Sequence, residues 1–97
     1  MIRSFADRAT ADIFHGVDSK AARKRLPPAL WKIAQRKMDM IDLVRHYAEL
    51  RSPPSNKLHP LDADRTGQWA IRINDQYRVA FRWEGEDAVD VEVTDYH

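Results

Sequence analysis

The 97-residue sequence predicts an α+β fold in which two N-terminal helices pack on a small, mainly antiparallel sheet. Apolar residues recur at helical spacings of three and four between residues 28 and 49, whereas they alternate with polar residues in three segments after residue 68. Turn-forming residues separate these three segments, which is typical of antiparallel hairpins. Helices that precede such hairpins in the chain favour one helical layer over one sheet face.

The length and composition exclude several classes of protein. A chain of this size has room for a single core, so we expect one domain over residues 1–97. The sequence has no cysteine, which excludes disulfide scaffolds and thiolate metal sites and agrees with a reducing compartment. No apolar run approaches the roughly 20 residues of a membrane span, and the first residues lack the apolar core of a signal peptide. We therefore expect a cytoplasmic protein.

The first thirty residues predict a strand, a short helix and a basic connection. Residues 2–5 form the strand. Asp7 is a suitable N-cap for a helix that Gly16 ends, because a carboxylate accepts hydrogen bonds from the first helical turn and glycine adopts the left-handed conformation of a helix end. Residues 18–28 contain four Lys and Arg residues and no apolar stripe, and we interpret them as a solvated loop.

A long amphipathic helix follows the basic connection. Pro28 suits its first position, where the missing N–H costs nothing. One apolar stripe then runs to about Glu49, and the prolines at residues 53–54 end the region. The stripe consists of Leu30, Trp31, Ala34, Met38, Ile41, Val44 and Ala48.

The three alternating segments predict half-buried strands at residues 69–73, 77–83 and 89–93, with turns at residues 74–76 and around residue 85. Trp69 and Trp83 fall on the apolar phase of this alternation. We therefore expect both rings beneath the helices.

The net charge of +1 conceals a segregation of charge along the chain. Residues 1–82 hold all sixteen basic residues and nine acidic ones, whereas residues 83–97 hold six acidic residues and no basic one. Eleven of the sixteen bases are Arg, whose planar fork suits phosphate. This distribution favours a basic surface for a polyanion, although the two parts of the chain can also neutralise one another within one sheet.

The strand alternation places several of these charges on the sheet face away from the helices. Arg72, Arg78 and Arg82 share that face with Asp90 and Glu92. Neighbouring arginines repel unless something neutralises them. Either the two acids do so as cross-strand pairs, or a phosphate backbone does.

The four histidines do not form a metal motif. None are spaced three or four residues apart and no carboxylate cluster accompanies them, so a zinc site is not expected. We assign no role to His15 or His46, which fall in or beside predicted helices. His59 precedes the three-strand region and His97 ends the last predicted strand.

Four segments identify a family resemblance, namely residues 1–5, 50–54, 64–78 and 91–97. The densest contains the run RINDQYR at residues 72–78, and the last ends in Asp95, Tyr96 and His97. In these motifs, and over nearly its whole length, the sequence resembles the HigB toxins of bacterial type II toxin–antitoxin modules, within the RelE/ParE superfamily.

This resemblance implies a RelE-like, microbial-ribonuclease-like fold whose concave sheet face holds RNA. It implies an endoribonuclease that needs no metal or cofactor, enters the ribosomal A site, cleaves mRNA there and arrests translation. The family's catalytic residues map to His59, Arg78, Asp95, Tyr96 and His97. Its other basic side chains map to Lys57 and Arg65. We add Arg72 to this RNA-binding set, because the strand alternation places it on the same sheet face as Arg78.

Metal-free cleavage uses the ribose 2′-OH as nucleophile, so it needs a base, a positive charge for the phosphorane and an acid for the leaving 5′-oxygen. We assign Asp95 or His97 as the base and His59 as the proton donor. Arg78 supplies the fixed charge. The Tyr96 ring either closes the core or stacks on a base.

The implied partners are the ribosome, mRNA and a HigA-type helix-turn-helix antitoxin, with operator DNA bound only by the toxin–antitoxin complex and no membrane involved. The basic residues 20–25 are compatible with an acidic antitoxin surface or ribosomal RNA, but we prefer a solvated loop. Two other functions remain open: a ParE-like inhibitor of DNA gyrase without nuclease activity, and an RNA-binding module that does not cleave. The proton-transfer groups at His59 and residues 95–97 favour the ribonuclease, because a pure binder does not need them.

Overall fold

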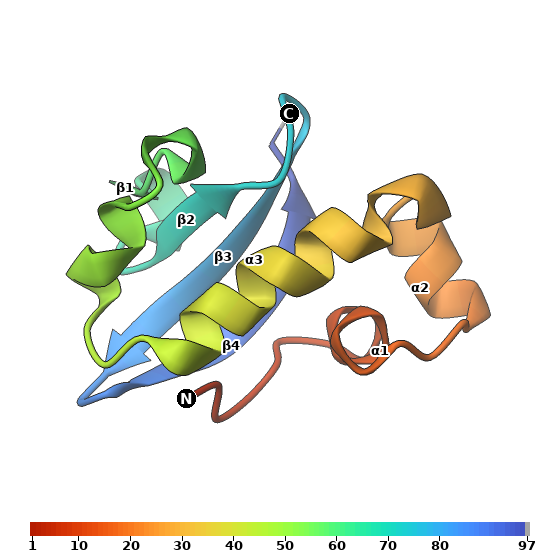
Figure 1. Cartoon of the computed structure of the whole chain (residues 1–97), viewed down its shortest axis with the longest axis horizontal. Helices are drawn as coiled ribbons and strands as arrows, with labels where there is room; N and C mark the ends of the chain where they lie inside the picture. The colour runs from red at the N-terminus through yellow and green to blue at the C-terminus, as the bar shows by residue number, and fades with distance from the viewer. Residues whose placement is uncertain (97) are drawn as a thin grey trace.

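The computed structural model describes residues 1–96. In this part of the chain, three α-helices precede a four-stranded antiparallel sheet of order β1-β2-β3-β4 (Figure 1). The predicted α+β class is therefore confirmed. The helices are α1 (Arg8–His15), α2 (Lys20–Arg25) and α3 (Trp31–Leu43), and the strands are β1 (His59–Pro60), β2 (Trp69–Arg72), β3 (Tyr77–Glu84) and β4 (Asp87–Asp95).

The first residues lie along the outer edge of β4. Residues 2–5 form only two isolated parallel bridges, Ile2 with Ala88 and Phe5 with Val91, so the strand predicted there is shorter than a regular one. Backbone hydrogen bonds to Ala88 and Val91 hold this segment in place. The chain then turns away from the sheet into α1.

Helix α1 begins and ends as predicted. The Asp7 carboxylate accepts a hydrogen bond from the Thr10 N–H at 2.8 Å, and Gly16 ends the helix with a φ of 72°. The prediction that the basic residues 18–28 form a loop is wrong, because they contain helix α2. Ser19 caps that helix by accepting from the Ala22 N–H at 3.1 Å. Ala22 is the buried residue of α2, so the six-residue helix shows no apolar stripe in the sequence.

The long helix starts at the predicted proline but ends early. A 3-10 turn over Pro28–Leu30 leads into α3, which stops at Leu43 rather than near Glu49. Val44 is extended, and His46 caps a separate 3-10 helix over Tyr47–Arg51. In this cap the His46 Nδ1 accepts from the Ala48 N–H and the Glu49 carboxylate accepts from the His46 N–H. These local hydrogen bonds compete with continuation of the helix.

The three predicted strands are confirmed as β2, β3 and β4, with both predicted turns. The register places Arg72 opposite Arg78, which agrees with the prediction that the two arginines share one sheet face. Between Ala80 and Arg82 the pairing with β4 shifts by one residue, and Asp90 takes a positive φ of 53° at this bulge. The two-residue strand β1 adds an edge to the sheet before the three alternating segments.

Helix α3 covers one sheet face and encloses the core (Figure 1). Trp69 and Trp83 are half-buried against this core, as predicted. Burying a large aliphatic or aromatic side chain contributes about 1.5–3 kcal/mol, so these contacts hold the layers together. Fully buried contributors from α3 and the strands include Ala34, Met38, Ile41, Ile71, Val79, Phe81, Val91 and Val93.

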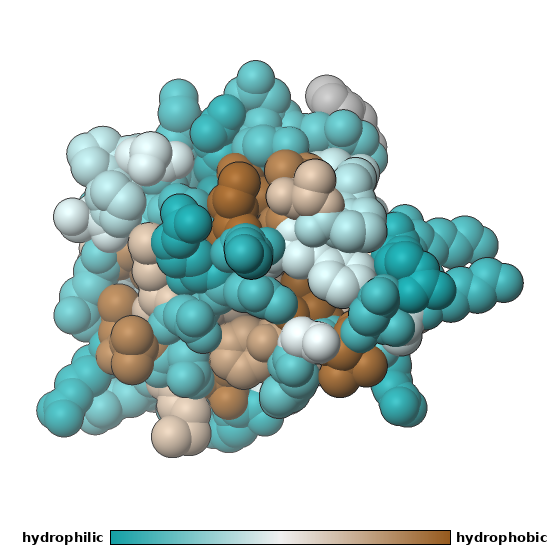
Figure 2. Space-filling model, turned by 45° about the vertical axis from the view of Figure 1, so that its right-hand side comes forward, coloured by the Kyte–Doolittle hydropathy of each residue, from teal (hydrophilic) through white to brown (hydrophobic). Residues whose placement is uncertain are grey.

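Outside the core, hydrophobic areas are separated by hydrophilic side chains on the face shown in Figure 2. No helix within residues 1–96 is both long enough and apolar enough to cross a bilayer. Among these residues, the large hydrophobic side chains that remain exposed are Met1, Val17, Leu43 and Tyr96. Tyr96 lies at the site described next.

Candidate active site

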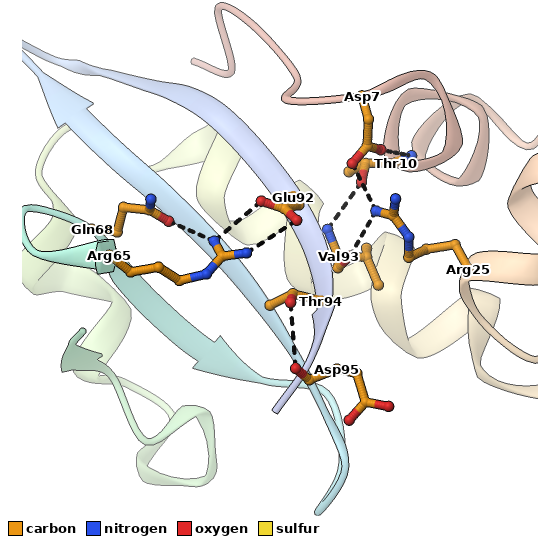
Figure 3. A network of polar contacts seen from close by, with 9 residues as sticks. All are labelled: Asp7, Thr10, Arg25, Arg65, Gln68, Glu92, Val93, Thr94 and Asp95. Carbon is orange, nitrogen blue, oxygen red and sulfur yellow. Dashed lines mark hydrogen bonds and ion pairs between the residues drawn. The ribbon is translucent and has the colours of Figure 1, made fainter. Parts of the chain in front are cut away.

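An arginine, Arg65, crosses the sheet face opposite α3. The register aligns Ala70, Ala80 and Glu92 across β2, β3 and β4. Arg65 comes from the connection between β1 and β2, and its guanidinium reaches the Glu92 carboxylate through two hydrogen bonds of 3.1 and 3.2 Å (Figure 3). Gln68 accepts a third bond from Arg65 at 2.9 Å. Because the two aligned alanines have small side chains, the arginine can lie across the sheet and bury them both.

A pocket of about 300 Å³ opens beside this arginine, between the β1–β2 connection and the end of β4. It combines two arginines with two carboxylates, a hydroxyl and an aromatic ring. These groups suit a polar ligand that carries both an anionic group and an aromatic nucleobase. The lining residues are Leu61, Asp62, Arg65, Ala70, Arg78, Thr94, Asp95 and Tyr96.

Arg78, on β3, is held in place by backbone carbonyls and by a ring. Its Nη1 donates to the carbonyl oxygens of Asn74 and Tyr77, and its Cζ lies 4.3 Å from the centroid of the Tyr96 ring. The Nε atom is buried and has no hydrogen-bond partner within residues 1–96. An unmet donor on a buried cation is favourable for an anion that can reach it.

The His59 ring, on β1, packs edge-to-face with the same Tyr96 ring. The centroids of the His59 and Tyr96 rings are 5.9 Å apart at an interplanar angle of 66°. The Nδ1 atom lies 2.8 Å from the Lys57 carbonyl oxygen, and a carbonyl accepts only, so Nδ1 carries a proton. The Nε2 atom is buried without a hydrogen-bond partner in the described chain. It is therefore the ring nitrogen that no group in residues 1–96 engages.

Asp95, the last residue of β4, lies on the other side of the strand from the Arg65–Glu92 pair. The register pairs it with Tyr77, and its carboxylate points away from that pair (Figure 3). The Gln76 side-chain amide donates to its Oδ2 at 3.0 Å. Asp95 nevertheless contributes to the pocket wall at the end of β4.

Lys57 and Arg72 do not line the pocket, although Arg72 pairs across the sheet with Arg78, which does. Arg72 donates to the Asp75 carboxylate at 2.5 Å. This hydrogen bond and the Arg72 charge, with smaller effects of Arg78 and Lys57, hold the pKa of Asp75 below its ordinary value. The charges of these three basic residues therefore act on one exposed acid.

The structure thus brings together most of the residues that the sequence singled out. His59 and Arg78 both contact the Tyr96 ring, and Asp95 and Arg65 share the pocket wall. Lys57 and Arg72 do not line the pocket. His97 lies outside the described residues. No three His, Asp or Glu side chains within residues 1–96 gather as a metal site would require.

Two pocket residues, Asp62 and Thr94, were not among the residues predicted from the sequence. Asp62 lines the pocket from a loop that carried no motif, whereas Thr94 continues the alternation of Glu92 and could have been placed on this face. The acids also pair differently from the expected scheme. Asp90 lies 3.9 Å from Arg82, but Glu92 pairs with Arg65 and not with an arginine of the strands.

Comparisons with known proteins give the same family as these motifs. Residues 3–97 match the family of the RelE-like toxin of type II toxin–antitoxin system HigB. "Endoribonuclease HigB" of Proteus vulgaris is 29% identical over 97 residues, which are all of both chains. "Toxin HigB-1" of Vibrio cholerae is 33% identical over 58 residues, 60% of this chain and 61% of that protein.

Two further comparisons concern an uncharacterised protein and a solved structure. The protein, from Haemophilus influenzae, is 36% identical over 63 residues, 65% of this chain and 62% of its own length. The matches therefore span about three fifths of the Haemophilus and Vibrio relatives. The "YoeB/ParE toxin from Agrobacterium tumefaciens" has a TM-score of 0.55 at 15% identity over the whole of both chains, which shows the shared fold. The chain belongs to the HigB family of RelE-like toxins from type II toxin–antitoxin systems.

Proposed function

We propose that this protein is the toxin of its module and acts as a ribosome-dependent, metal-independent endoribonuclease that cleaves mRNA in the ribosomal A site and arrests translation. The observation that carries the proposal is the convergence of Arg78 and His59 on the Tyr96 ring beside a polar pocket. The endoribonuclease name of the Proteus relative, matched over its full length, supports the same activity.

Arg78 is the group that would stabilise the transition state. During cleavage the ribose 2′-oxygen bonds to the adjacent phosphorus as the bond to the 5′-oxygen breaks, and negative charge builds on the phosphoryl oxygens. A guanidinium that is already held by two carbonyls and a ring needs little reorganisation to meet that charge. Arg65, on the pocket wall, adds a second positive charge for the RNA backbone, partly neutralised by Glu92.

The proton transfers need one acceptor and one donor. His59 suits the donor, because its Nε2 is not engaged by any group in residues 1–96 and can protonate the departing 5′-oxygen. Asp95 at the pocket wall, or His97, takes the proton from the 2′-hydroxyl. The products are a 2′,3′-cyclic phosphate and a free 5′-hydroxyl.

A toxin of this family acts with an antitoxin. We propose that the partner here is a HigA-type helix-turn-helix protein that neutralises the toxin in the cytoplasm, and that only the complex of the two binds operator DNA. The charge of the open sheet face fits the toxin's other proposed partner, the mRNA on the ribosome. Arg72 pairs with the exposed Asp75 carboxylate, and the charges of Arg78 and Lys57 also act on it.

The test is primer-extension mapping of a defined mRNA on purified ribosomes, comparing the wild type with Arg78→Ala and His97→Ala, all with a free C-terminus. We expect cuts in the A-site codon that depend on ribosomes, with a rate at least about 100-fold lower in Arg78→Ala, since removing one transition-state donor has effects of this size. His97→Ala should also lose cleavage while still binding ribosomes.

Arg82→Ala is the matched control, because Arg82 lies on the same strand and outside the pocket lining. It should cleave at close to the wild-type rate. Intact message with folded wild-type protein would contradict the proposal and favour the gyrase-directed or non-cleaving alternatives. Equal losses in the two arginine variants would instead mean that general basic charge matters, with no special role for Arg78.

A further inference from the structure

The turn between β2 and β3 holds the end of β4 through one residue. The Gln76 side-chain amide donates to the Asp95 carboxylate at 3.0 Å, and the Gln76 carbonyl accepts from the Tyr96 N–H at 2.6 Å. Side chain and backbone of Gln76 therefore hold two successive residues that belong to the candidate site.

Gln76 is itself fixed by its neighbour. The Asn74 side-chain oxygen accepts hydrogen bonds from the backbone N–H groups of Gln76 and Tyr77 at 2.9 and 2.8 Å, which closes the turn as an Asx motif. The Asn74 carbonyl oxygen in addition accepts from Arg78. The turn between β2 and β3 thus orients both Arg78 and the Tyr96 residue that contacts it.

The last regular strand pair in this region is Tyr77 with Asp95, so Tyr96 lies beyond the ladder. Its half-exposed ring contacts Arg78 and His59, and its backbone N–H is held by Gln76. A strand end in this position frays unless it is tied down. The hydrogen bonds of Gln76 supply that restraint where the site needs it.

We infer that Gln76 is a positioning residue, which fixes the Asp95 carboxylate and the Tyr96 ring relative to Arg78 for the cleavage reaction. This inference rests on the proposed ribonuclease activity.

A neutral amide is suited to hold the Asp95 carboxylate, because charged side chains already surround that residue. A second cavity on the other side of Asp95 is lined by Lys24, Arg25 and Glu92, and Asp75 precedes Gln76 in the turn.

The test compares Gln76→Ala and Gln76→Glu with the wild type in two measurements. Single-turnover cleavage on programmed ribosomes should fall about tenfold in Gln76→Ala, with the half-saturating ribosome concentration changed less than about twofold, because misplacement affects the chemical step more than docking. Gln76→Glu should lose more, since it places a second carboxylate against Asp95. Amide hydrogen exchange at Tyr96 should become faster in both variants.

Glu86→Ala, in the exposed turn between β3 and β4, is the control and should match the wild type in both measurements. The inference is overturned if Gln76→Ala cleaves at the wild-type rate, or if its rate falls while exchange at Tyr96 is unchanged. If the wild type itself does not cleave, the proposed function fails, and the exchange measurement still decides whether Gln76 holds the chain end.

Discussion

The Arg78 guanidinium lies over the face of the Tyr96 ring, with its Cζ 4.3 Å from the ring centroid. The His59 ring contacts the same ring in an edge-to-face arrangement, with 5.9 Å between the two centroids. A cation over an aromatic face gains about 0.5–2 kcal/mol, depending on how far it is desolvated. The ring therefore holds in place an arginine whose Nε has no partner within residues 1–96.

Tyr96→Phe should retain most of the cleavage activity, because it keeps the ring that contacts Arg78 and His59. Tyr96→Leu removes the ring and should lower the single-turnover rate by about tenfold or more, as expected from the loss of a cation–π contact at a partly buried site. Both rates can be measured on programmed ribosomes. A Phe variant as slow as the Leu variant would assign the role to the hydroxyl instead.

The Arg65–Glu92 pair should contribute measurably to stability, because it is bidentate and both side chains are about two-thirds buried or more. A double-mutant cycle with alanine at both positions, followed by urea unfolding, should give a coupling free energy of about 1 kcal/mol. The Arg82–Asp90 pair is a control on the same sheet face. It is longer, at 3.9 Å, and more exposed, and its coupling should be smaller. Equal couplings would contradict this ranking.

Lys37 should make stability depend on pH in the alkaline range. Its side chain is buried, and its Nζ donates a hydrogen bond to the Asn56 Oδ1 at 2.6 Å. Burial, followed by the nearby charges of Arg36 and Arg72, lowers the pKa of Lys37 below the ordinary 10.5. Above the lowered pKa the folded state has lost a proton that the unfolded state still binds, so the free energy of unfolding should rise with pH until about 10.5.

Urea unfolding between pH 8 and 10.5 measures this effect in the wild type and in Lys37→Met, which cannot titrate. The wild type should gain stability relative to the variant as the pH rises. The variant should also be less stable overall, by about 1–3 kcal/mol, because it leaves the Asn56 side-chain oxygen without its donor. A difference that does not change with pH would show that Lys37 keeps its ordinary pKa.

Asp7 joins α1, α2 and the sheet edge. Its carboxylate caps α1 and accepts from Arg25 at 2.7 Å, and Arg25 also donates to the Val93 carbonyl. Burial raises the pKa of Asp7, but the hydrogen bonds from Arg25 and Thr10 outweigh it, so the pKa lies below the ordinary 3.8. The stability that this group contributes is therefore present above pH 3.8 and is lost as the pH falls through the lowered value.

Asp7→Ala should destabilise the protein by about 1–2 kcal/mol, because it removes the helix cap and the ion pair. Asp7→Asn keeps a good capping group and should lose less. Acid titration of the unfolding free energy should show that the advantage of the wild type over Asp7→Asn shrinks below pH 3.8. A constant advantage down to low pH would contradict the ion-pair explanation.

Much of the fold could be predicted because local patterns decide it. The alternation at Trp69, Ile71 and Ile73 predicts β2, and the Asp7 and Gly16 caps define α1. The rest depends on contacts that leave no local pattern. The helix at Lys20–Arg25 buries one small side chain, so its only sequence signal is the Ser19 cap.

The candidate site could be predicted at the level of residues but not of geometry. The family resemblance implied His59, Arg78 and Tyr96, and the alternation predicted that Arg72 and Arg78 share a sheet face, where the register pairs them. No local pattern indicates that Arg65 crosses the sheet to Glu92, 27 residues away, because this pairing depends on small residues in two other strands.

The edges of the sheet have a consequence for self-association. Residues 1–6 pair with the outer edge of β4, and beyond them the Thr10 hydroxyl and the Arg25 guanidinium bond to the N–H and carbonyl of Val93. The opposite edge is the two-residue β1, in which Pro60 has no N–H to offer. Uncovered strand edges promote aggregation by pairing with other chains. Within the described chain both edges are obstructed, so the molecule can leave one sheet face open without recruiting a strand from a second copy.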